Sequence, residues 1–202
     1  MEPGLAAHDA MSMTTAWLLL AMLALHAGFT WARIAVFRID GSTPRGVRLI
    51  EVAAASSIAV GLGLVATRGD SSGWRGLAAT LLAGASAGLF AWGLHTIPRL
   101  QFTAAFSNDP PTTLVTRGPY RYIRHPFYAA YVMAHALPIV ATGSLWAWPG
   151  LLGMAAIYAR AAHLEERKFL ASPMAAAWRE HQRRTGWFLP RWRTPAPKEA
   201  AQ

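Results

Sequence analysis

The length, composition and charge of this chain exclude most classes of soluble protein. The chain has 202 residues, of which 53% are hydrophobic and only 14% charged, whereas roughly 25% of the residues of an average soluble domain are charged. Its 19 basic and 10 acidic residues give a net charge of +9, and it contains no cysteine. Disulfide scaffolds, thiolate metal sites and cysteine nucleophiles are therefore excluded. The composition predicts an integral membrane protein.

Five apolar stretches follow one another along the chain. Three of them, over residues 13–37, 49–67 and 77–97, have about the ~20 residues with which a helix crosses a bilayer. Two shorter ones, of about 16 to 18 residues, begin at Phe127 and near Leu145. A bilayer offers the backbone no hydrogen-bond partners, so segments that span it this way are helical. We therefore expect an all-α membrane protein with about five transmembrane helices.

The distribution of basic residues predicts the orientation of these helices. If the N-terminus lies outside, every basic residue except Arg68 and Arg75 falls on the cytosolic side or in the C-terminal segment. This asymmetry is the one that the positive-inside rule describes. Basic residues on a membrane face meet anionic headgroups, and the sequence contains no recognisable nucleic-acid-binding module. We expect the N-terminus outside, the C-terminus in the cytosol, and no nucleic-acid partner.

The last two apolar stretches predict a tight antiparallel helical hairpin. Only the short linker ATGSLWAWPG separates them, and Pro149 fits the first turn of the returning helix. The polar segment after the hairpin is too small to form a core of its own. We expect a single membrane domain over 1–202, with three N-terminal helices (13–97), a cytosolic loop (98–126), the hairpin (127–164) and a short cytosolic C-terminal cap (165–202).

Ionisable residues in or near the predicted spans leave two interpretations open. Such groups are costly in a bilayer and are often functional, but each can also be a hydrogen-bonded packing residue. The ionisable residues concerned are His26, Glu51, His95 and His135. The histidines among them lack the i, i+4 spacing of a helical metal pair, so we expect no metal site.

A small-residue face from Gly84 to Gly88 allows close helix packing. It leaves both a monomer and a homodimer open.

The segment over residues 112–128, TTLVTRGPYRYIRHPFY, concentrates polar and aromatic side chains. Proline is favoured at the first helical position and pushes the preceding residue out of helical geometry, so we expect a helix to begin at Pro126 with His125 as its cap. The first turn of a helix presents backbone N–H groups and a positive dipole end. With Arg121 and Arg124 beside it, this turn predicts an anion site at the membrane surface.

Glu165 and Glu166 form the second polar concentration, where the fifth apolar stretch ends. A hairpin returns the end of its second helix to the start of its first, so we expect this carboxylate pair near His125. Carboxylates opposite a basic helix N-terminus suit a zwitterion with separate carboxylate and amine groups. The simpler interpretations are interfacial anchoring for the arginines and tyrosines and a solvated helix face for the glutamates.

These residues together resemble a known family. The run from Leu114 to Tyr128, with GPYRY followed by RHPFY, closely resembles the signature of the isoprenylcysteine carboxyl methyltransferase family. That family includes bacterial integral-membrane methyltransferases and is related to the phospholipid N-methyltransferases. The later Glu165-Glu166 pair, the RRT of residues 183–185 and the FLP of residues 188–190 resemble its closing pattern. The resemblance covers about residues 95–191.

The resemblance implies S-adenosyl-L-methionine as methyl donor, bound at the cytosolic face. His125 and Glu165 are the candidate catalytic residues, and aromatic rings such as Tyr120 and Tyr128 can contact a sulfonium or an adenine. The bacterial members of the family suggest an inner-membrane location. Carried over residue by residue, the cofactor contacts fall on Thr112, Thr113, Leu114, Val115, Tyr120, His125, Pro126, Phe127, Tyr128 and Glu165.

The sequence departs from the family pattern at three places. An arginine that the prenylcysteine enzymes assign to the acceptor corresponds to Ala161 here, which leaves Arg160, one position earlier, as the candidate substrate-binding residue. Trp178 and His181 stand where two tyrosines are usual, and only Gln101 is a loose match for a cofactor-contacting glutamine. The acceptor therefore need not be a prenylated cysteine.

We expect the acceptor to be a hydrophobic small molecule or lipid that enters laterally from the bilayer. Methyl transfer requires the nucleophile ~3 Å from the methyl carbon with the leaving sulfur opposite, so positioning dominates catalysis. An amine or phenol would also need a base, for which His125 or a glutamate is the candidate. Two alternatives stay open: an NADPH-dependent membrane reductase of the sterol-reductase type, which has a similar RHP-containing region, and a non-catalytic membrane scaffold.

Overall fold

The computed structural model describes residues 11–35, 45–68, 73–97, 111 and 113–191 of the chain. Within this part of the chain the secondary structure is helical, apart from one isolated bridge between Ile123 and Gly186. The prediction of an all-α protein is thereby confirmed. The elements in chain order are α1 (Met13–Ala35), α2 (Arg45–Arg68), α3 (Trp74–Thr96), η1 (Gly118–Arg121), α4 (Pro126–Thr142), η2 (Leu145–Ala147), α5 (Trp148–Leu170) and α6 (Ala175–Arg184).

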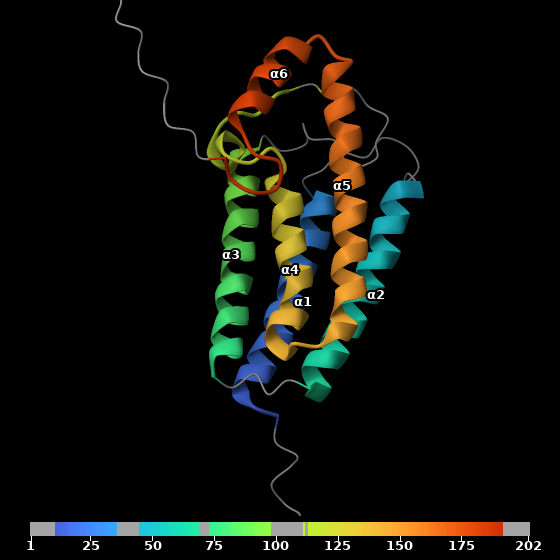
Figure 1. Ribbon diagram of the computed structural model, residues 1–202, viewed down its shortest axis with the longest axis vertical. Helices are drawn as coiled ribbons and strands as arrows, with labels where there is room; N and C mark the ends of the chain where they lie inside the picture. The colour runs from blue at the N-terminus through green and yellow to red at the C-terminus, as the bar shows by residue number, and fades with distance from the viewer. Residues whose placement is uncertain (1–10, 36–44, 69–72, 98–110, 112, 192–202) are drawn as a thin grey trace, which may run out of the picture.

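Helices α1 to α5 form one bundle, and α6 covers one end of it (Figure 1). Helix α4 is central, because it contacts each of the other four. Small residues allow this: Ala130 and Ala134 are fully buried, and the hydroxyl of Ser86 on α3 donates to the carbonyl of Ala130 over 2.8 Å. A helix with alanines on its packing face lets its neighbours approach closely, as is usual in membranes.

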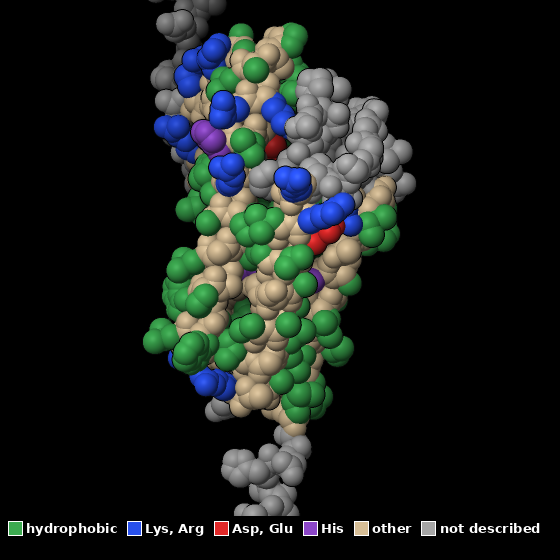
Figure 2. Space-filling model, turned by 90° about the vertical axis from the view of Figure 1, so that its right-hand side faces the viewer, with side chains coloured by type: hydrophobic (Ala, Val, Ile, Leu, Met, Phe, Trp, Pro, Cys, Tyr) green, Lys and Arg blue, Asp and Glu red, His purple; other side chains and the backbone are tan. Residues whose placement is uncertain are grey.

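Three helices, α1, α2 and α3, are long and apolar enough to cross a membrane. Large apolar side chains such as Leu20, Val52 and Leu81 are more than half exposed on them, and hydrophobic side chains cover the middle of the bundle in Figure 2. An exposed apolar belt of this kind marks a surface that meets lipid. Helix α4 is apolar but has only 17 residues, so the count of five crossings stays a prediction.

Helices α4 and α5 lie side by side and run in opposite directions (Figure 1). The turn between them contains η2, which Ser144 caps: the amide of Trp146, the second residue of η2, donates to the hydroxyl of Ser144. Pro149 stands in the first turn of α5, as predicted. Helix α5 continues to Leu170, past the boundary predicted at residue 164, so Glu165 and Glu166 lie on a continuous helix.

Charged side chains divide between the two ends of the bundle. At the end with η2, Arg68 Nη1 donates to the hydroxyl of Ser144 over 3.4 Å, and Arg75 lies against Trp74. Most of the other Lys and Arg side chains in view gather at the end with α6 (Figure 2). The charge asymmetry predicted from the sequence therefore has a spatial counterpart along the bundle axis.

The orientation follows as a prediction. A reporter that is active only in the cytosol should be active when fused after Gln202, and one active only outside should be silent there, because basic segments resist translocation. The same reporters fused after Arg68, at the opposite end of the bundle, should give the reverse result. Strong outside-specific activity after Gln202 would contradict the N-out, C-in orientation.

Candidate functional site

The C-terminal segment is attached to the segment that precedes α4. Backbone hydrogen bonds join Arg124 N to Gly186 O over 2.9 Å, Gly186 N to Tyr122 O over 2.9 Å, and His125 N to Trp187 O over 3.2 Å. A Cβ on Gly186 would come within 1.9 Å of the carbonyl oxygen of Leu189, so only glycine fits there. This short backbone pairing holds the residues after α6 against the segment that precedes α4.

Arg124 reinforces this attachment with its side chain. Its Nη1 donates to the carbonyls of Thr185 and Gln182, over 2.7 and 3.3 Å, at the end of α6. Its Nε donates to Glu166 Oε1 over 2.8 Å, and Gln182 Nε2 donates to the other carboxylate oxygen over 2.9 Å. A cation near the last carbonyls of a helix is stabilising. Arg124 therefore joins α4, α5 and α6.

His125 lies between the two predicted carboxylates. Its ring Nε2 is 3.1 Å from Glu166 Oε1 and its Nδ1 is 3.6 Å from Glu165 Oε2, and the side chain is 5% exposed. Burial by itself lowers the pKa of His125, but the two carboxylates outweigh it and raise that pKa above the ordinary value. An imidazolium that meets an acceptor at both nitrogens has no lone pair with which to accept a proton.

The two adjacent glutamates have different surroundings. Burial opposes ionisation of Glu166, yet the hydrogen bonds from His125 and Arg124 lower its pKa to about 2. Glu165 accepts a short hydrogen bond from the hydroxyl of Tyr128 and lines a cavity. Neighbouring residues point about 100° apart on a helix, which turns Glu166 toward the attachment and Glu165 toward the open space.

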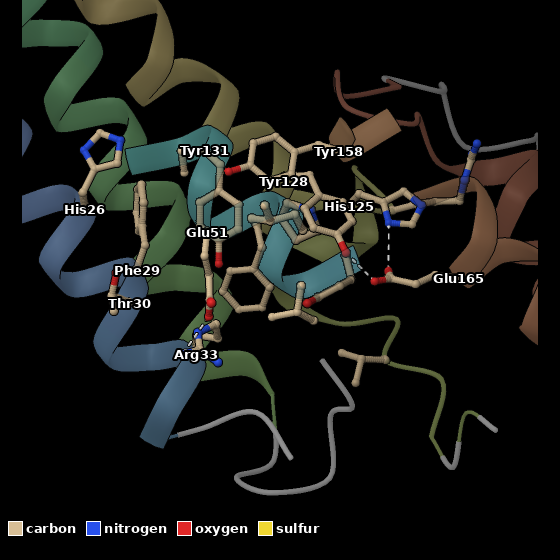
Figure 3. Close-up of a pocket in the computed structure, with 18 of the residues that line it drawn as sticks. His26, Phe29, Thr30, Arg33, Glu51, His125, Tyr128, Tyr131, Tyr158 and Glu165 are labelled. Atoms are coloured by element: carbon tan, nitrogen blue, oxygen red, sulfur yellow. Dashed lines mark hydrogen bonds and ion pairs between the residues drawn. The ribbon is translucent and has the colours of Figure 1, made fainter. Parts of the chain in front are cut away.

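This cavity has a volume of about 520 Å³, within the roughly 300–1,000 Å³ range of small-molecule sites. Figure 3 shows Glu165 and His125 at one side of it, and Arg33 and Glu51 at the other. Every predicted cofactor residue that the structure describes is on its wall; Thr112 lies outside the described residues. Those lining residues are Thr113, Leu114, Val115, Tyr120, His125, Pro126, Phe127, Tyr128 and Glu165.

Aromatic rings form much of the wall around Glu165. Tyr128 is stacked between His125, at 5.7 Å between ring centroids, and Tyr158, at 5.5 Å. From α6, Trp178 and His181 also line the cavity. Burial and the nearby charges of Arg124 and His125 lower the pKa of His181 to about 4, so this ring is neutral near pH 7.

Two residues that line the cavity each have a buried side-chain nitrogen without a hydrogen-bond partner. These atoms are Trp178 Nε1 and His26 Nε2, and within the described part of the chain no other buried side-chain nitrogen or oxygen is unpaired. Native proteins leave few such atoms unsatisfied, and each one calls for an explanation such as water or a ligand.

Helices α1 and α2 contribute a wall that the motif analysis did not predict. His26, Phe29, Thr30 and Arg33 all line the cavity from α1, and their i, i+3, i+4, i+7 spacing puts them on one helix face. Arg33 Nη2 pairs with Glu51 Oε1 of α2 over 2.9 Å. The signal was present in the sequence as a polar stripe within an apolar helix.

The structure does not bring the remaining candidates to this cavity. Arg160 is exposed and is not on the wall, whereas Ala161 is fully buried in the helix packing. His95 is exposed and bonds to its own helix. His135 bonds to Ser57 over 3.0 Å and lines a second cavity of about 420 Å³ between α2, α4 and α5.

The sequence also led us to expect no metal site and gave Gln101 as a loose match for a cofactor-contacting glutamine. Among the residues that the structure describes, no group of three or more His, Cys, Asp or Glu side chains is placed to hold a metal ion. The loosely matched Gln101 lies outside the described ranges.

The central part of the chain matches a known family model. Residues 79–168 match the model of the isoprenylcysteine carboxyl methyltransferase family, which confirms the resemblance seen in the signature. The matched region begins within α3, contains α4, and ends near the end of α5, so α1, α2 and the closing pattern after residue 168 lie outside it. A search of curated proteins finds no match.

The role of Glu166 in holding the C-terminal segment against the start of α4 yields a stability prediction. Glu166→Gln should lower the free energy of unfolding by about 1.5–3 kcal/mol, because hydrogen bonds to a charged carboxylate become weaker neutral ones. Thermal unfolding in detergent, followed by tryptophan fluorescence, measures it. The matched control is Glu180→Gln, since Glu180 is an exposed carboxylate of α6 whose pairs with Arg183 and Arg184 lie on the surface and contribute little. Equal stability of the Glu166 variant and wild type would contradict this role.

The same cluster predicts a pH window. The raised pKa of His125 means that its contribution is complete below pH 6.5 and is lost as the pH rises through that raised value. The lowered pKa of Glu166 means that its contribution is complete above pH 4.5 and is lost as the pH falls toward 2. Both contributions are complete between pH 4.5 and pH 6.5. The stability difference between wild type and Glu166→Gln should therefore be largest in that range.

Proposed function

We propose that this protein transfers a methyl group from S-adenosyl-L-methionine to a hydrophobic or lipid-like acceptor at the cytosolic membrane face. One observation carries the proposal: the residues of the family signature and Glu165, far apart in the sequence, line a single cavity. The match of residues 79–168 to a family of membrane methyltransferases supports it. We further propose a bacterial inner-membrane location with the α6 end of the bundle in the cytosol.

The polar groups on the α6 side of the cavity fit a zwitterionic donor. The carboxylate of Glu165 can hold an amine or a ribose hydroxyl, and the unpaired Trp178 Nε1 can donate to an acceptor on the bound molecule. The first turn of α4 has no side-chain cap, and its dipole favours a carboxylate. The rings of Tyr120 and Tyr128 offer faces for cation–π contact or stacking.

The residues of the site act mainly by positioning. When bound, S-adenosyl-L-methionine supplies an electrophilic methyl group on a sulfonium centre. The stacked Tyr128 and the ion-paired His125 hold Glu165 in a defined place, and restricting geometry in this way is what an in-line displacement needs. Within this arrangement the carboxylate of Glu165, which lines the cavity, is the candidate proton acceptor for an amine or phenol. His125 is proposed chiefly to position Glu165 and accepts a proton only after it has lost one.

The donor site can be tested by titration calorimetry with S-adenosylhomocysteine. Glu165→Gln and His125→Ala should each weaken binding about 10- to 100-fold, because one charge-assisted contact is worth ~1.5–3 kcal/mol. Glu166→Gln should weaken it less, since Glu166 is not on the cavity wall. His95→Ala is the control for an exposed histidine away from the site.

The same titration separates the competing functions. Wild-type protein should bind S-adenosylhomocysteine and not NADPH. Binding of NADPH alone would favour a membrane reductase, and binding of neither would favour a scaffold. Unchanged S-adenosylhomocysteine affinity in both Glu165→Gln and His125→Ala, with normal behaviour in detergent, would contradict the site.

The acceptor class can be tested by incubating purified protein and labelled donor with a membrane lipid extract, a soluble metabolite extract or a prenylcysteine analogue. Label should appear in the lipid fraction, because the cavity is bordered by helices that face the bilayer. Label only in water-soluble products would contradict lateral access. Efficient esterification of the prenylcysteine analogue would show that the substitution of Ala161 for the usual arginine does not exclude that acceptor.

A further inference from the structure

The side of the cavity formed by α1 and α2 has polar groups of its own. Arg33 and Glu51 line it as an ion pair of 2.9 Å whose side chains are 33% and 42% exposed. Deeper along α1, His26 Nδ1 donates to the carbonyl of Met22 over 2.7 Å, so its Nε2 carries a lone pair, which is buried and unpaired. This side of the cavity therefore combines a partly exposed ion pair with a histidine whose buried Nε2 has no partner.

Aromatic and apolar side chains line the cavity between these groups and Glu165. In Figure 3, Arg33 and Glu51 lie on one side and Glu165 on the other, with Tyr131 next to Glu51 and Tyr128 next to Glu165. Ile50, Ala54 and Ile58 of α2 add apolar side chains to the cavity lining. A molecule that reaches from Arg33 toward Glu165 must therefore be amphiphilic.

We infer that Arg33, with Glu51 as its exchangeable partner, binds an anionic headgroup of the methyl acceptor, and that this anion is separate from the atom that is methylated. The inference rests on the proposed methyltransferase function. A phosphate or a carboxylate would supply the required oxygens, since the guanidinium fork matches both. The acceptor is then an anionic amphiphile with its nucleophile directed toward Glu165.

The two arginines on the cavity wall differ in how far they are already bonded. Arg124 is occupied, because its guanidinium donates to Glu166 and to two carbonyls at the end of α6. Arg33 has the single partner Glu51 among the residues that the structure describes. Partly exposed ion pairs contribute little stability, so an entering anion can displace Glu51 at small cost.

The experiment measures displacement of a fluorescent fatty acid from purified protein by three probes with the same chain: oleyl phosphate, oleate and oleyl alcohol. At least one anionic probe should bind about 10-fold or more tightly than the alcohol. Arg33→Gln should remove this preference, Arg33→Lys should restore part of it, and Glu51→Gln should strengthen anion binding by removing a like charge. Arg48→Gln, an exposed arginine of α2 off the cavity wall, should behave as wild type.

Binding of S-adenosylhomocysteine in the same preparations separates this inference from the proposed function. Saturating S-adenosylhomocysteine should leave anionic-probe binding in place, and Arg33→Gln should leave S-adenosylhomocysteine binding in place. Equal binding of all three probes, an unchanged preference in Arg33→Gln, or strict competition with S-adenosylhomocysteine would overturn the inference. Inorganic phosphate that binds as tightly as oleyl phosphate would overturn the amphiphile assignment. A wild-type protein that binds no S-adenosylhomocysteine would instead refute the proposed function.

If Arg33→Gln fails to fold, as judged by loss of S-adenosylhomocysteine binding, Glu51→Gln decides the matter. Tighter binding of the anionic probes by that variant supports the inference, and unchanged or weaker binding overturns it.

Discussion

The attachment of the C-terminal cap to the start of α4 is the constraint on which the cavity depends, and Glu166 is at its centre. Three donors from two segments converge on this carboxylate: Arg124 Nε and His125 Nε2 from the start of α4, and Gln182 Nε2 from α6. Hydrogen bonds that involve charged groups are about twice as strong as neutral ones. Because the His125 ring also reaches Glu165, the cluster that fastens the cap also orients the carboxylate that faces the cavity.

Helix α4 connects this attachment to the rest of the bundle through its packing against α3 and α5. Its alanines pack against α3, and Phe127 lies against Gly93, where a Cβ would come within 2.9 Å of the ring. Close packing on that face leaves the larger Tyr128 and Tyr131 to form the cavity wall, with Tyr128 stacked on Tyr158 of α5. The helix that is most enclosed by its neighbours therefore supplies the most regular part of the site, as expected where rotamers are restricted by packing.

Polar groups in the molecule divide into those that hold the structure and those that remain available. Arg124 and Glu166 are bonded on several sides, so their charges are already balanced within the protein. Arg33 and Glu51 form one partly exposed pair, and Trp178 Nε1 has no partner. Since binding a ligand requires groups whose existing interactions are cheap to exchange, the second set is the one from which recognition can be built.

The sequence by itself determined the membrane class, the helical fold and the cap at His125, because composition, apolar length and proline geometry are local properties. It also predicted that the hairpin would return Glu165 toward His125. Only the tertiary structure decided that Glu166 faces the attachment, since the rotation of a helix depends on its neighbours. It also decided that Arg33 and Glu51 share a cavity with the signature, because side chains on separate apolar helices meet only through packing, which no local pattern encodes.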